Sequence, residues 1–373
     1  MRIAVNTRLL LDGKLDGIGW FTYETLKRIT IQHPEHQFIF LFDRPYHKDF
    51  IFAENVIPVV LYPPARHPVL WYMFFEWSIT KALKKYKADV FISPDGWLSL
   101  STNLKTLTVI HDLNFEHFPQ FLKFSHSVYF KYFFHRFAQK ADRIVTVSQY
   151  SKNDISKLYG ITEDKIDVVY NGSHELYRPV DEKTKKRMKA EFTNNKPYFI
   201  FISTIHPRKN IANLFVAFDL FRKTYDTETK LVIVGQKQWW NGEIANAYES
   251  MEFKKEVIFT GRLAPEILND LLASSLALTY VSFFEGFGIP IVEAFYAETA
   301  VITSNITSMP EIAGDAALLV DPYSINAIAE AMHTLDTDNE LRTSLIEKGK
   351  QRRLNFSWDK SAKELWKSIE KIL

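Results

Sequence analysis

The chain has 373 residues, of which 46% are hydrophobic and 24% are charged. At about 150 residues per domain this length predicts two domains, and the composition is that of a folded protein, not of a disordered or fibrous one. The formal net charge of +2 argues against a dedicated nucleic-acid-binding protein, and the lack of cysteine excludes disulfides, thiolate catalysis and cysteine metal sites.

Short runs of β-branched and aromatic residues alternate with longer helical patterns along the chain. In the first half we predict strands at residues 2–6, 37–42, 56–61, 90–93, 105–110, 143–147 and 165–169. In the second half we predict them at residues 198–203, 230–234, 256–260, 275–281 and 300–303. Continuous apolar runs such as residues 199–202 indicate strands buried on both faces. The alternation therefore predicts an α/β fold with parallel sheets and right-handed crossovers.

A charge-dense and turn-like segment, residues 179–197, separates the two halves. We place the domain boundary after Arg178, which gives domains of residues 1–178 and 179–356. Residues 357–373 are predicted to form a last helix with Ser357 as its N-cap. Its apolar face repeats at helical spacing and consists of Trp358, Ala362, Leu365, Trp366 and Ile369.

The chain starts directly in a strand-like run, and no secretory leader pattern precedes it. No stretch of the sequence is long and apolar enough to cross a bilayer. We therefore expect a cytoplasmic protein.

The most informative stretch is residues 282–295, which follow a predicted buried strand. Gly286 and Gly288 let the backbone turn tightly and approach a ligand closely, and Pro290 suits the first turn of a helix. The N–H groups of Gly288 and Ile289 are then expected to face open space at the positive end of a helix, which is an anion site.

Two carboxylates flank this expected anion site. Glu285 precedes the helix, and Glu293 is expected in its first turn, so both could accept hydrogen bonds from ligand hydroxyls. For Glu293 alone, a structural interpretation as a favourable first-turn acid is preferred. For the whole string, a functional interpretation is preferred by several to one.

The string Glu285 to Ala294 resembles the Glu-x7-Glu signature of the retaining GT-B glycosyltransferases of family four, the "group 1" glycosyltransferases. Further segments are similar to motifs of the same family, in the same order, over nearly the whole chain. They are residues 16–19 (Asp-Gly-Ile-Gly), 109–113 (Val-Ile-His-Asp-Leu), 143–148, 168–172, 205–210 (Ile-His-Pro-Arg-Lys-Asn), 259–263 (Phe-Thr-Gly-Arg-Leu) and 311–317. The resemblance implies two Rossmann-like domains that face each other across a cleft, with the last helix packed back on the first domain.

The resemblance also implies roles for individual residues. Arg208 and Lys209 would supply fixed cations for the diphosphate of a sugar nucleotide, where negative charge develops as the bond to the sugar breaks. Backbone amides of Gly286, Phe287, Gly288 and Ile289, with Gly17 from the first domain, would bind the same diphosphate. Glu285 and His111 would bind the transferred sugar as the catalytic residues. The structural alternative for His111 is a buried histidine whose tautomer Asp112 fixes. Glu293 would bind the ribose hydroxyls, and Arg262 and Leu263 would border the base.

Some positions depart from the family pattern. Glu298 stands where glycine is usual, which predicts a narrower nucleotide site, and Thr204 stands where many members have arginine, so that Arg208 would replace it. Glu311 lies three residues after Ser308, which predicts a capping box as readily as a ligand role. The Asp336-Thr-Asp338 pair lies far from the matched motifs and is not expected to bind a metal.

The acceptor is expected on the first domain. Residues 118–140 contain no acidic residue and interleave lysine and arginine with phenylalanine and tyrosine, and the aromatic run 71–77 precedes four lysines. One interpretation is a peripheral contact with an anionic membrane, on the inner face of the cell membrane, near a lipid-linked acceptor. The other is a set of core aromatics under a solvated lysine face, and the sequence favours neither.

The sequence therefore predicts transfer of a hexosyl unit, with retention and without metal or other cofactor, from a GDP- or UDP-sugar to a saccharide or lipid-linked saccharide. Mannose is favoured, because the His-Asp and Pro-Arg-Lys-Asn variants resemble those of bacterial mannosyltransferases. Alternatives are a sugar-nucleotide epimerase of the same fold and a two-domain sugar-binding protein without chemistry. No nucleic-acid partner is expected, and the oligomeric state is left open.

Overall fold

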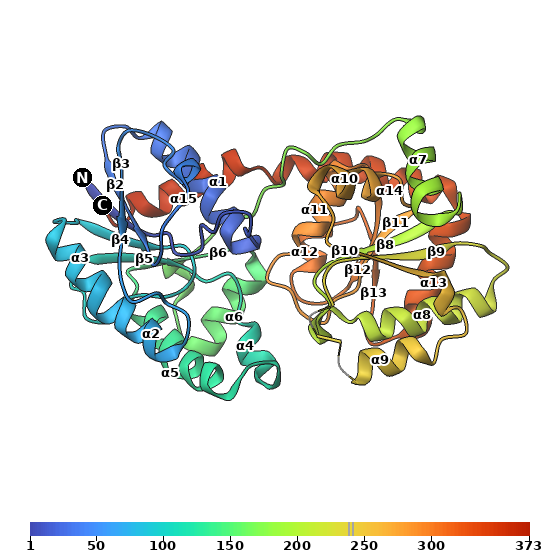
Figure 1. The fold of residues 1–373 in the computed structure, drawn as a ribbon, viewed down its shortest axis with the longest axis horizontal. Helices are drawn as coiled ribbons and strands as arrows, with labels where there is room; N and C mark the ends of the chain where they lie inside the picture. The colour runs from blue at the N-terminus through green and yellow to red at the C-terminus, as the bar shows by residue number, and fades with distance from the viewer. Residues whose placement is uncertain (238, 241) are drawn as a thin grey trace. The chain divides into compact units, whose positions relative to one another are not determined.

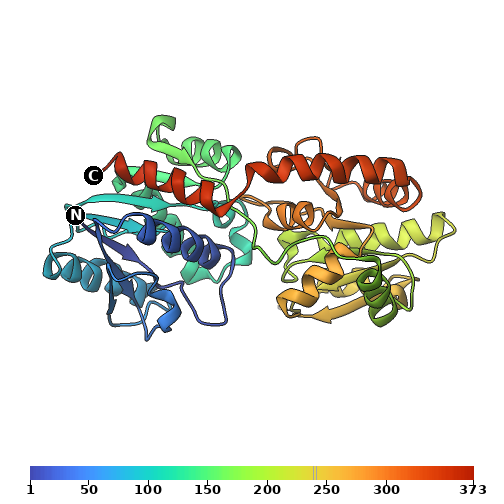
Figure 2. The same cartoon turned by 90° about the horizontal axis from the view of Figure 1, so that it is seen from above.

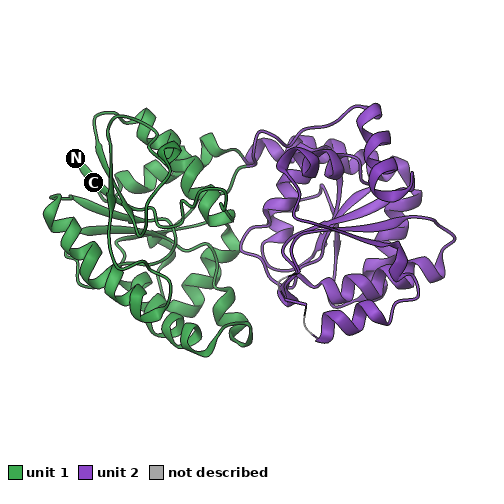
Figure 3. Cartoon of the chain, in the orientation of Figure 1, with its two compact units in different colours: residues 1–172, 357–373 green, residues 173–356 purple. Residues whose placement is uncertain are grey.

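The protein, described here by a computed structural model, consists of two compact units (Figure 3). The structure describes residues 1–237, 239–240 and 242–373. Unit 1 comprises residues 1–172 and 357–373, and unit 2 comprises residues 173–356. The chain therefore leaves unit 1, builds all of unit 2 and returns.

Unit 1 contains a parallel sheet whose order is β3-β2-β1-β4-β5-β6-β7 among the described residues. Its strands are β1 (Arg2–Asn6), β2 (Gln37–Phe42), β3 (Val56–Val60), β4 (Val90–Ser93), β5 (Lys105–Val109), β6 (Arg143–Thr146) and β7 (Ile166–Val168). Its helices are α1 (Gly17–Gln32), α2 (Pro68–Tyr72), α3 (Thr80–Lys85), α4 (Asn114–His117), α5 (Phe124–Lys140), α6 (Gln149–Tyr159) and α15 (Trp358–Glu370). A π-helical stretch, Met73–Ile79, joins α2 to α3.

Unit 2 contains a second parallel sheet, of order β10-β9-β8-β11-β12-β13 (Figure 1). Its strands are β8 (Tyr198–Ile202), β9 (Lys230–Val234), β10 (Val257–Gly261), β11 (Ala277–Tyr280), β12 (Ala300–Ser304) and β13 (Leu318–Val320). Its helices are α7 (Glu182–Thr193), α8 (Ile211–Thr224), α9 (Gly242–Glu249), α10 (Pro265–Ala273), α11 (Ile289–Tyr296), α12 (Met309–Ala313), α13 (Ile325–Thr337) and α14 (Asn339–Arg352). Helices α8, α9 and α13 share one core with the sheet.

The strand predictions are confirmed to within a few residues at each end. Phe199 and Phe201 of β8 are fully buried, as are Leu231 and Ile233 of β9, because helices cover both faces of the sheet. Strand β13 has no counterpart among the predictions. It has three residues, and Leu319 at its centre is exposed, so it lacks the continuous apolar run by which the others are found.

Both sheets reverse their strand order at one point. In unit 1 the reversal lies between β1 and β4, and in unit 2 it lies between β8 and β11. In open α/β sheets the loops that leave the carboxyl ends of two such strands diverge to opposite faces and leave a crevice for ligands. The fold alone therefore predicts that ligands bind at the loops after β1, β4, β8 and β11.

The C-terminal helix α15 packs against α1 within unit 1 (Figure 2). Ser357 is its N-cap, accepting from the Lys360 amide, and Trp358, Leu365 and Ile369 are buried. The boundary of the units lies at Gly172, six residues before the expected Arg178. Residues 173–178 go with unit 2 because the Arg178 amide donates to Asn269 Oδ1, at 2.9 Å, and Tyr177 interacts with Glu293.

Candidate functional site: a cation–carboxylate cluster in unit 2

Two loops meet at the strand-order reversal of unit 2. The loop after β8 contains the 3₁₀ turn Pro207–Lys209, and the loop after β11 runs through residues 281–288 to α11. Asn210 joins them: its side-chain amide donates to the carbonyls of Val281 and Pro322, each at 2.8 Å. Asn210 has φ of +60°, a left-handed conformation that asparagine tolerates better than most residues. The turn is thereby fixed against the loop that carries the acidic residue.

Glu285 accepts from both cations of the turn. Its Oε1 lies 2.5 Å from Lys209 Nζ, and its Oε2 lies 3.1 Å from Arg208 Nη1. Lys209 Nζ also donates to the Tyr280 hydroxyl at 2.9 Å. The Glu285 side chain is 9% exposed, and those of Lys209 and Arg208 are 13% and 17% exposed. Two positive charges and one negative charge therefore meet in a largely buried cluster.

The charge balance of the cluster sets the ionisation of Glu285. Burial alone would raise the pKa of this carboxyl, but the charges and hydrogen bonds of Lys209 and Arg208 outweigh burial and lower the pKa to about 2. The carboxylate is therefore ionised throughout the physiological range. The cluster keeps an excess positive charge, which suits a second anion better than a neutral ligand.

The loop from Glu285 to Gly288 is fastened from the other side by Ser308. Its hydroxyl lies 2.9 Å from the Glu285 carbonyl and 3.0 Å from the Phe287 carbonyl. This contact replaces the predicted capping box, which is wrong: Ser308 makes no side-chain cap for α12. Gly288 has φ of +100°, a conformation that glycine adopts freely, and it forms the N-cap of α11.

Helix α11 therefore begins at Ile289, beside the cation–carboxylate cluster. The first amides of any α-helix have no carbonyl partner within that helix and carry its positive dipole end. Pro290 lies in the first turn as predicted. The chain thus places backbone donors, a guanidinium and an ammonium group at the carboxyl end of two adjacent strands.

Glu293 lies just beyond the first turn of α11, in which it was expected. The helix starts at Ile289, so Glu293 is its fifth residue, and the first turn contains no acid. Burial raises the pKa of its carboxyl to about 7, against a smaller lowering by the Tyr177 phenol. A carboxyl with this pKa changes its charge near neutral pH, which is expected of functional groups more than of surface acids.

Arg262 and Leu263 lie in the loop after β10, at the edge of the sheet. Arg262 is exposed and Leu263 is half-buried. The preceding Gly261 pairs its carbonyl with the amide of Gly235, so this loop and the loop after β9 are joined. The structure places both residues at the carboxyl edge that also carries the cluster, two strands away from β8.

The remaining predicted residues, His111 and Gly17, belong to unit 1. His111 follows β5, and its Nε2 lies 2.8 Å from the Pro94 carbonyl. Burial lowers the pKa of His111, so the ring is neutral near pH 7. Because a carbonyl only accepts, Nε2 carries the proton and Nδ1 is left as an acceptor. The alternative in which Asp112 fixes this tautomer is wrong: Asp112 Oδ1 instead accepts from the Asn114 amide at 3.0 Å.

Gly17 is the first residue of α1, whose N-cap is Asp16. Phe21, one turn along α1, meets the His111 ring edge-on with 5.1 Å between centroids. Unit 1 therefore brings the start of α1 and His111 to the same region, and unit 2 brings Arg208, Lys209 and Glu285 together.

One departure from the family pattern and the discounted aspartate pair have structural explanations. Glu298 has φ of +56°, which accounts for glycine being usual there, and its carboxylate pairs with Lys350 at 3.1 Å. The carboxylate of Glu298 thus contacts α14. This contact gives no support to the predicted narrowing of the nucleotide site. Asp336 accepts from Thr227 and Thr229, and Asp338 caps α14. In the described residues no group of three or more histidines and acids is arranged to hold a metal ion.

Sequence reasoning missed the partners that hold the site. Tyr280, Tyr177, Ser308 and Pro94 all contact predicted site residues. Only Tyr280 could have been found from the sequence, because it is the last residue of β11 and lies just before the loop that carries Glu285. The others come from segments whose approach depends on the tertiary fold.

Two Rossmann-like α/β units, each with a parallel sheet that reverses its strand order at one point, define a protein of the GT-B fold. The family model described as "Glycosyltransferase Family 4" matches residues 15–174, and the model described as "Glycosyl transferases group 1" matches residues 182–352. The chain belongs to the group 1 glycosyltransferases and is an enzyme of that class.

Named relatives support the same assignment. O-antigen chain mannosyltransferase B of Escherichia coli is 27% identical over 279 residues, which are 74% of this chain and 73% of that protein. O-antigen chain mannosyltransferase RfbU of Salmonella typhimurium is 27% identical over 258 residues, 68% of this chain and 67% of that one. The structure of Anabaena HepE in complex with UDP-glucose superposes with a TM-score of 0.77 over 100% of both chains, at 16% identity, which shows a common fold.

Proposed function

We propose that this enzyme transfers a mannosyl unit from GDP-mannose to a saccharide or lipid-linked saccharide, with retention of the anomeric configuration and without a metal ion. The observation that carries the proposal is the cluster of Arg208 and Lys209 around Glu285, beside the start of α11. Its excess positive charge and backbone donors suit a departing diphosphate, whose negative charge grows as the bond from the sugar to phosphate breaks.

The proposed reaction needs no protein nucleophile. The acceptor hydroxyl forms a bond to the anomeric carbon on the face from which the diphosphate leaves, and its proton passes to a diphosphate oxygen. Glu285 accepts from hydroxyls of the transferred sugar, and Nδ1 of neutral His111 accepts from another. Glu293 accepts from the ribose hydroxyls, and Arg262 and Leu263 border the base. Gly17 adds a backbone donor.

Mannose is preferred because the named relatives quoted above are mannosyltransferases. UDP-glucose is the alternative donor, since a structural neighbour was solved with it.

The direct test is nucleotide release from a panel of GDP-mannose, UDP-glucose and UDP-galactose, with methyl α-D-mannopyranoside as acceptor. We expect GDP release from GDP-mannose, an α-linked product by proton NMR, and no loss of rate with EDTA. Lys209→Met should reduce the rate at least 100-fold. Lys196→Met, which removes an exposed lysine of the same unit paired with Glu228, should not. Equal rates for the two variants would contradict the proposed role of the cluster.

We also propose that unit 1 contacts an anionic membrane surface. Among the described residues, no helix has the length and apolarity required to cross a bilayer, so the contact would be peripheral. The aromatic residues of the two predicted stretches divide between core and surface. Tyr129, Phe134, Phe137, Phe74 and Phe75 are buried, whereas Trp77, Phe124 and Tyr132 are 59%, 85% and 53% exposed.

The exposed aromatics lie among basic residues, and we call this surface the basic aromatic surface: Tyr72, Trp77, Lys81, Lys84, Lys85, Phe124, Lys131, Tyr132 and Arg136. Tyr72 joins its two halves, lying 6.2 Å from Trp77 and 6.0 Å from Phe133 of α5 between ring centroids. The acid within it, Glu76, is turned inward and accepts from the Leu100 and Ser101 amides at 2.7 and 3.0 Å. The surface therefore offers positive charge and aromatic side chains, which suit anionic lipid headgroups.

Sedimentation with vesicles of phosphatidylglycerol and phosphatidylcholine tests this contact. We expect pelleting that weakens with salt, and loss of pelleting in Trp77→Ser/Phe124→Ser. The control variant is Ile267→Ser, which removes an exposed apolar side chain from unit 2. It should pellet like the wild type. Failure of the wild type to pellet at physiological salt would contradict the membrane proposal.

A further inference from the structure

The strand-order reversal of unit 1 repeats a feature of unit 2. In unit 2, the loop after the first strand carries Arg208 and Lys209, and the loop after the fourth strand carries Glu285. In unit 1, the loop after the first strand, β1, carries Arg8, and the loop after the fourth strand, β4, carries Asp95. Both units therefore place a cation and a carboxylate at equivalent points of their topology, where ligands bind in folds of this kind.

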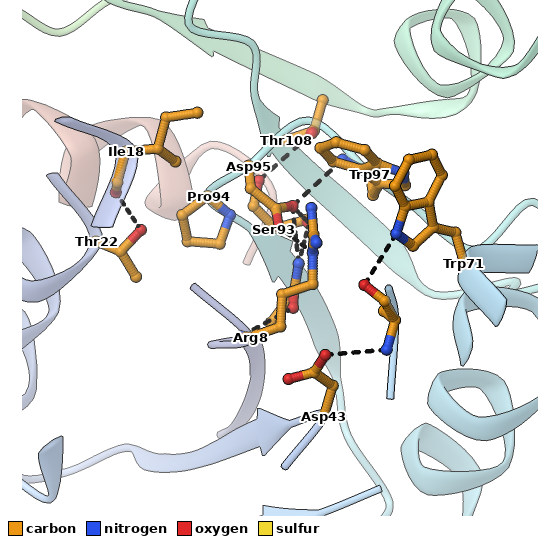
Figure 4. A network of polar contacts seen from close by, with 12 residues as sticks. Arg8, Ile18, Thr22, Asp43, Trp71, Ser93, Pro94, Asp95, Trp97 and Thr108 are labelled. Atoms are coloured by element: carbon orange, nitrogen blue, oxygen red, sulfur yellow. Dashed lines mark hydrogen bonds and ion pairs between the residues drawn. The ribbon is translucent and has the colours of Figure 1, made fainter. Parts of the chain in front are cut away.

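Arg8 is held from two sides (Figure 4). Its Nε lies 2.6 Å from Asp95 Oδ2, and its guanidinium carbon lies 4.2 Å from the centroid of the Trp97 ring. The Arg8 side chain is only 8% exposed. An ion pair in the plane of the guanidinium and an aromatic ring below that plane leave the group little freedom to rotate.

Asp95 is occupied by its other contacts. Its Oδ1 accepts from the Asn6 side-chain amide at 2.8 Å and from the Ser93 hydroxyl at 3.0 Å. With Oδ2 bound to Arg8, the carboxylate is used to fix the orientation of the guanidinium. Asp95 is therefore a positioning residue for the Arg8 guanidinium.

The terminal nitrogens of Arg8 form no hydrogen bond or ion pair with the residues that the structure describes. Among the described residues, no acceptor lies within hydrogen-bonding distance of its Nη1 or Nη2, and neither is a fully enclosed atom. Structural arginines of the same unit bind differently. Arg44 contacts both oxygens of Asp43, at 2.7 and 2.8 Å, and Arg143 contacts both oxygens of Asp167, at 3.3 and 2.6 Å. Arg44 and Arg143 thus use Nε together with Nη2, whereas Arg8 uses Nε alone and keeps the fork of its two terminal nitrogens, Nη1 and Nη2, without a protein acceptor among the described residues.

Arg8 is also linked to His111. Pro94, whose carbonyl accepts from His111 Nε2, is followed directly by Asp95, which holds Arg8. The order β1-β4-β5 puts the three loops side by side along one edge of the sheet. A ligand on the Arg8 fork would therefore lie next to the imidazole that is proposed to bind the transferred sugar.

The chemistry of the ligand follows from the charges at this edge. Asp95 offsets the charge of Arg8, and His111 is neutral, so the edge favours a neutral ligand with several oxygen acceptors over an anion. We propose that the fork of Arg8 binds hydroxyl or ring oxygens of a neutral saccharide, and that this saccharide is the acceptor. The acceptor assignment rests on the proposed function; the saccharide site itself does not.

The binding test uses the full chain and methyl α-D-mannopyranoside, measured by saturation-transfer NMR without any donor. We expect Arg8→Lys, which keeps the charge opposite Asp95 but loses the fork, to weaken binding at least tenfold. Arg143→Lys is the matched control, because it removes a fork from a structural pair at the opposite edge of the same sheet, and it should bind like the wild type. Since a buried pair tolerates single changes poorly, Arg8→Gln/Asp95→Asn provides a second variant in which both charges are removed together.

A transfer assay separates this inference from the proposed function. With GDP-mannose as donor, Arg8→Lys should raise the KM for methyl α-D-mannopyranoside at least tenfold and lower kcat less, and the GDP-induced shift of the unfolding midpoint should remain. Equal saccharide affinity in wild type and both Arg8 variants would overturn the inference, as would a preference of the wild type for mannose 6-phosphate over the neutral glycoside. If no donor is consumed but saccharide binding still depends on Arg8, the proposed function fails and the saccharide site stands.

Discussion

At the scale of single residues, the candidate site is governed by the charge balance around Glu285. A buried carboxylate between two cations stabilises the fold only while all three groups are present, because removal of one leaves the others unpaired. Glu285→Ala would thus mix a loss of function with a loss of stability. Glutamine, which is neutral and has the same shape as glutamate, separates the loss of function from the loss of stability.

We therefore expect Glu285→Gln to lower the transfer rate about 100- to 1000-fold while the protein remains folded. The amide oxygen still accepts one hydrogen bond, but Lys209 and Arg208 lose the opposing charge. The fold should lose about 1–3 kcal/mol in the free energy of unfolding, measured by urea denaturation. A rate within threefold of the wild type would show that Glu285 has no catalytic role.

Glu293 makes stability depend on pH. Its pKa is about 7 in the folded protein and 4.5 in the reference state, so between these values the folded chain holds a proton that the unfolded chain has lost. The free energy of unfolding should accordingly fall as pH rises from about 4.5 to about 7 and change little from this group above that.

Glu293→Gln should remove this decline and stabilise the protein at pH 8 relative to the wild type, by about 1–3 kcal/mol. The advantage should vanish at pH 4. Urea unfolding of both proteins at the two pH values measures it. Glu266→Gln, at an exposed position in the same unit, should show no such difference between pH values. An advantage of equal size at pH 4 and pH 8 would refute a raised pKa.

At the scale of elements, the start of α11 depends on the backbone of Gly288. A Cβ at this position would strain the left-handed conformation and lie 3.2 Å from Ile291 Cδ1. The helix would then begin with a displaced first turn, and its first amides would be displaced relative to the proposed diphosphate site.

Gly288→Ala should therefore weaken GDP binding at least tenfold, measured by isothermal titration calorimetry. Gly160→Ala is the matched control: Gly160 also has positive φ, of +65°, with nothing near its Cβ position, and it ends α6 in unit 1. Both substitutions should cost about 1 kcal/mol of stability. Weakened GDP binding in both variants would mean that strain, not the position of α11, is responsible.

The same loop shows where sequence patterns stop being informative. The Glu-x7-Glu string located the turn, the helix and the proline correctly, because glycine and proline act locally. It placed Glu293 within the first turn instead of just beyond it, because the exact start of the helix at Ile289 depends on the left-handed conformation of Gly288. The role of Ser308 could not be predicted either. Its hydroxyl could cap α12 or donate to the carbonyls of Phe287 and Glu285, 21 and 23 residues earlier, and the second arrangement depends on the tertiary fold.

At the scale of the whole molecule, the two units share a strand topology but differ in the number of chain segments that form them. Unit 2 is one continuous segment, whereas unit 1 needs residues 357–373 to complete it. Periodicity alone predicted the buried strands and the amphipathic helix α15. The return of α15 to unit 1 was expected from the family resemblance. The boundary at Gly172 could not be predicted from composition, because it depends on a contact between segments far apart in the chain. The backbone of Gly172 packs so closely on the start of α15 that a Cβ at this position would lie 2.4 Å from the Trp358 amide nitrogen.

Because α15 is the last segment of unit 1, its burial should stabilise that unit and leave the proposed nucleotide site of unit 2 intact. Leu365 is completely buried, and Leu365→Ala should cost about 2–5 kcal/mol in the stability of unit 1. Hydrogen exchange should show faster opening of α1 and α15, while the GDP-induced protection of α11 stays as in the wild type. Lys363→Ala, on the exposed face of the same helix, should change neither. If Leu365→Ala abolished GDP protection of α11 at temperatures where unit 1 is still folded, the two units would not be the independent stability units that their separate cores indicate.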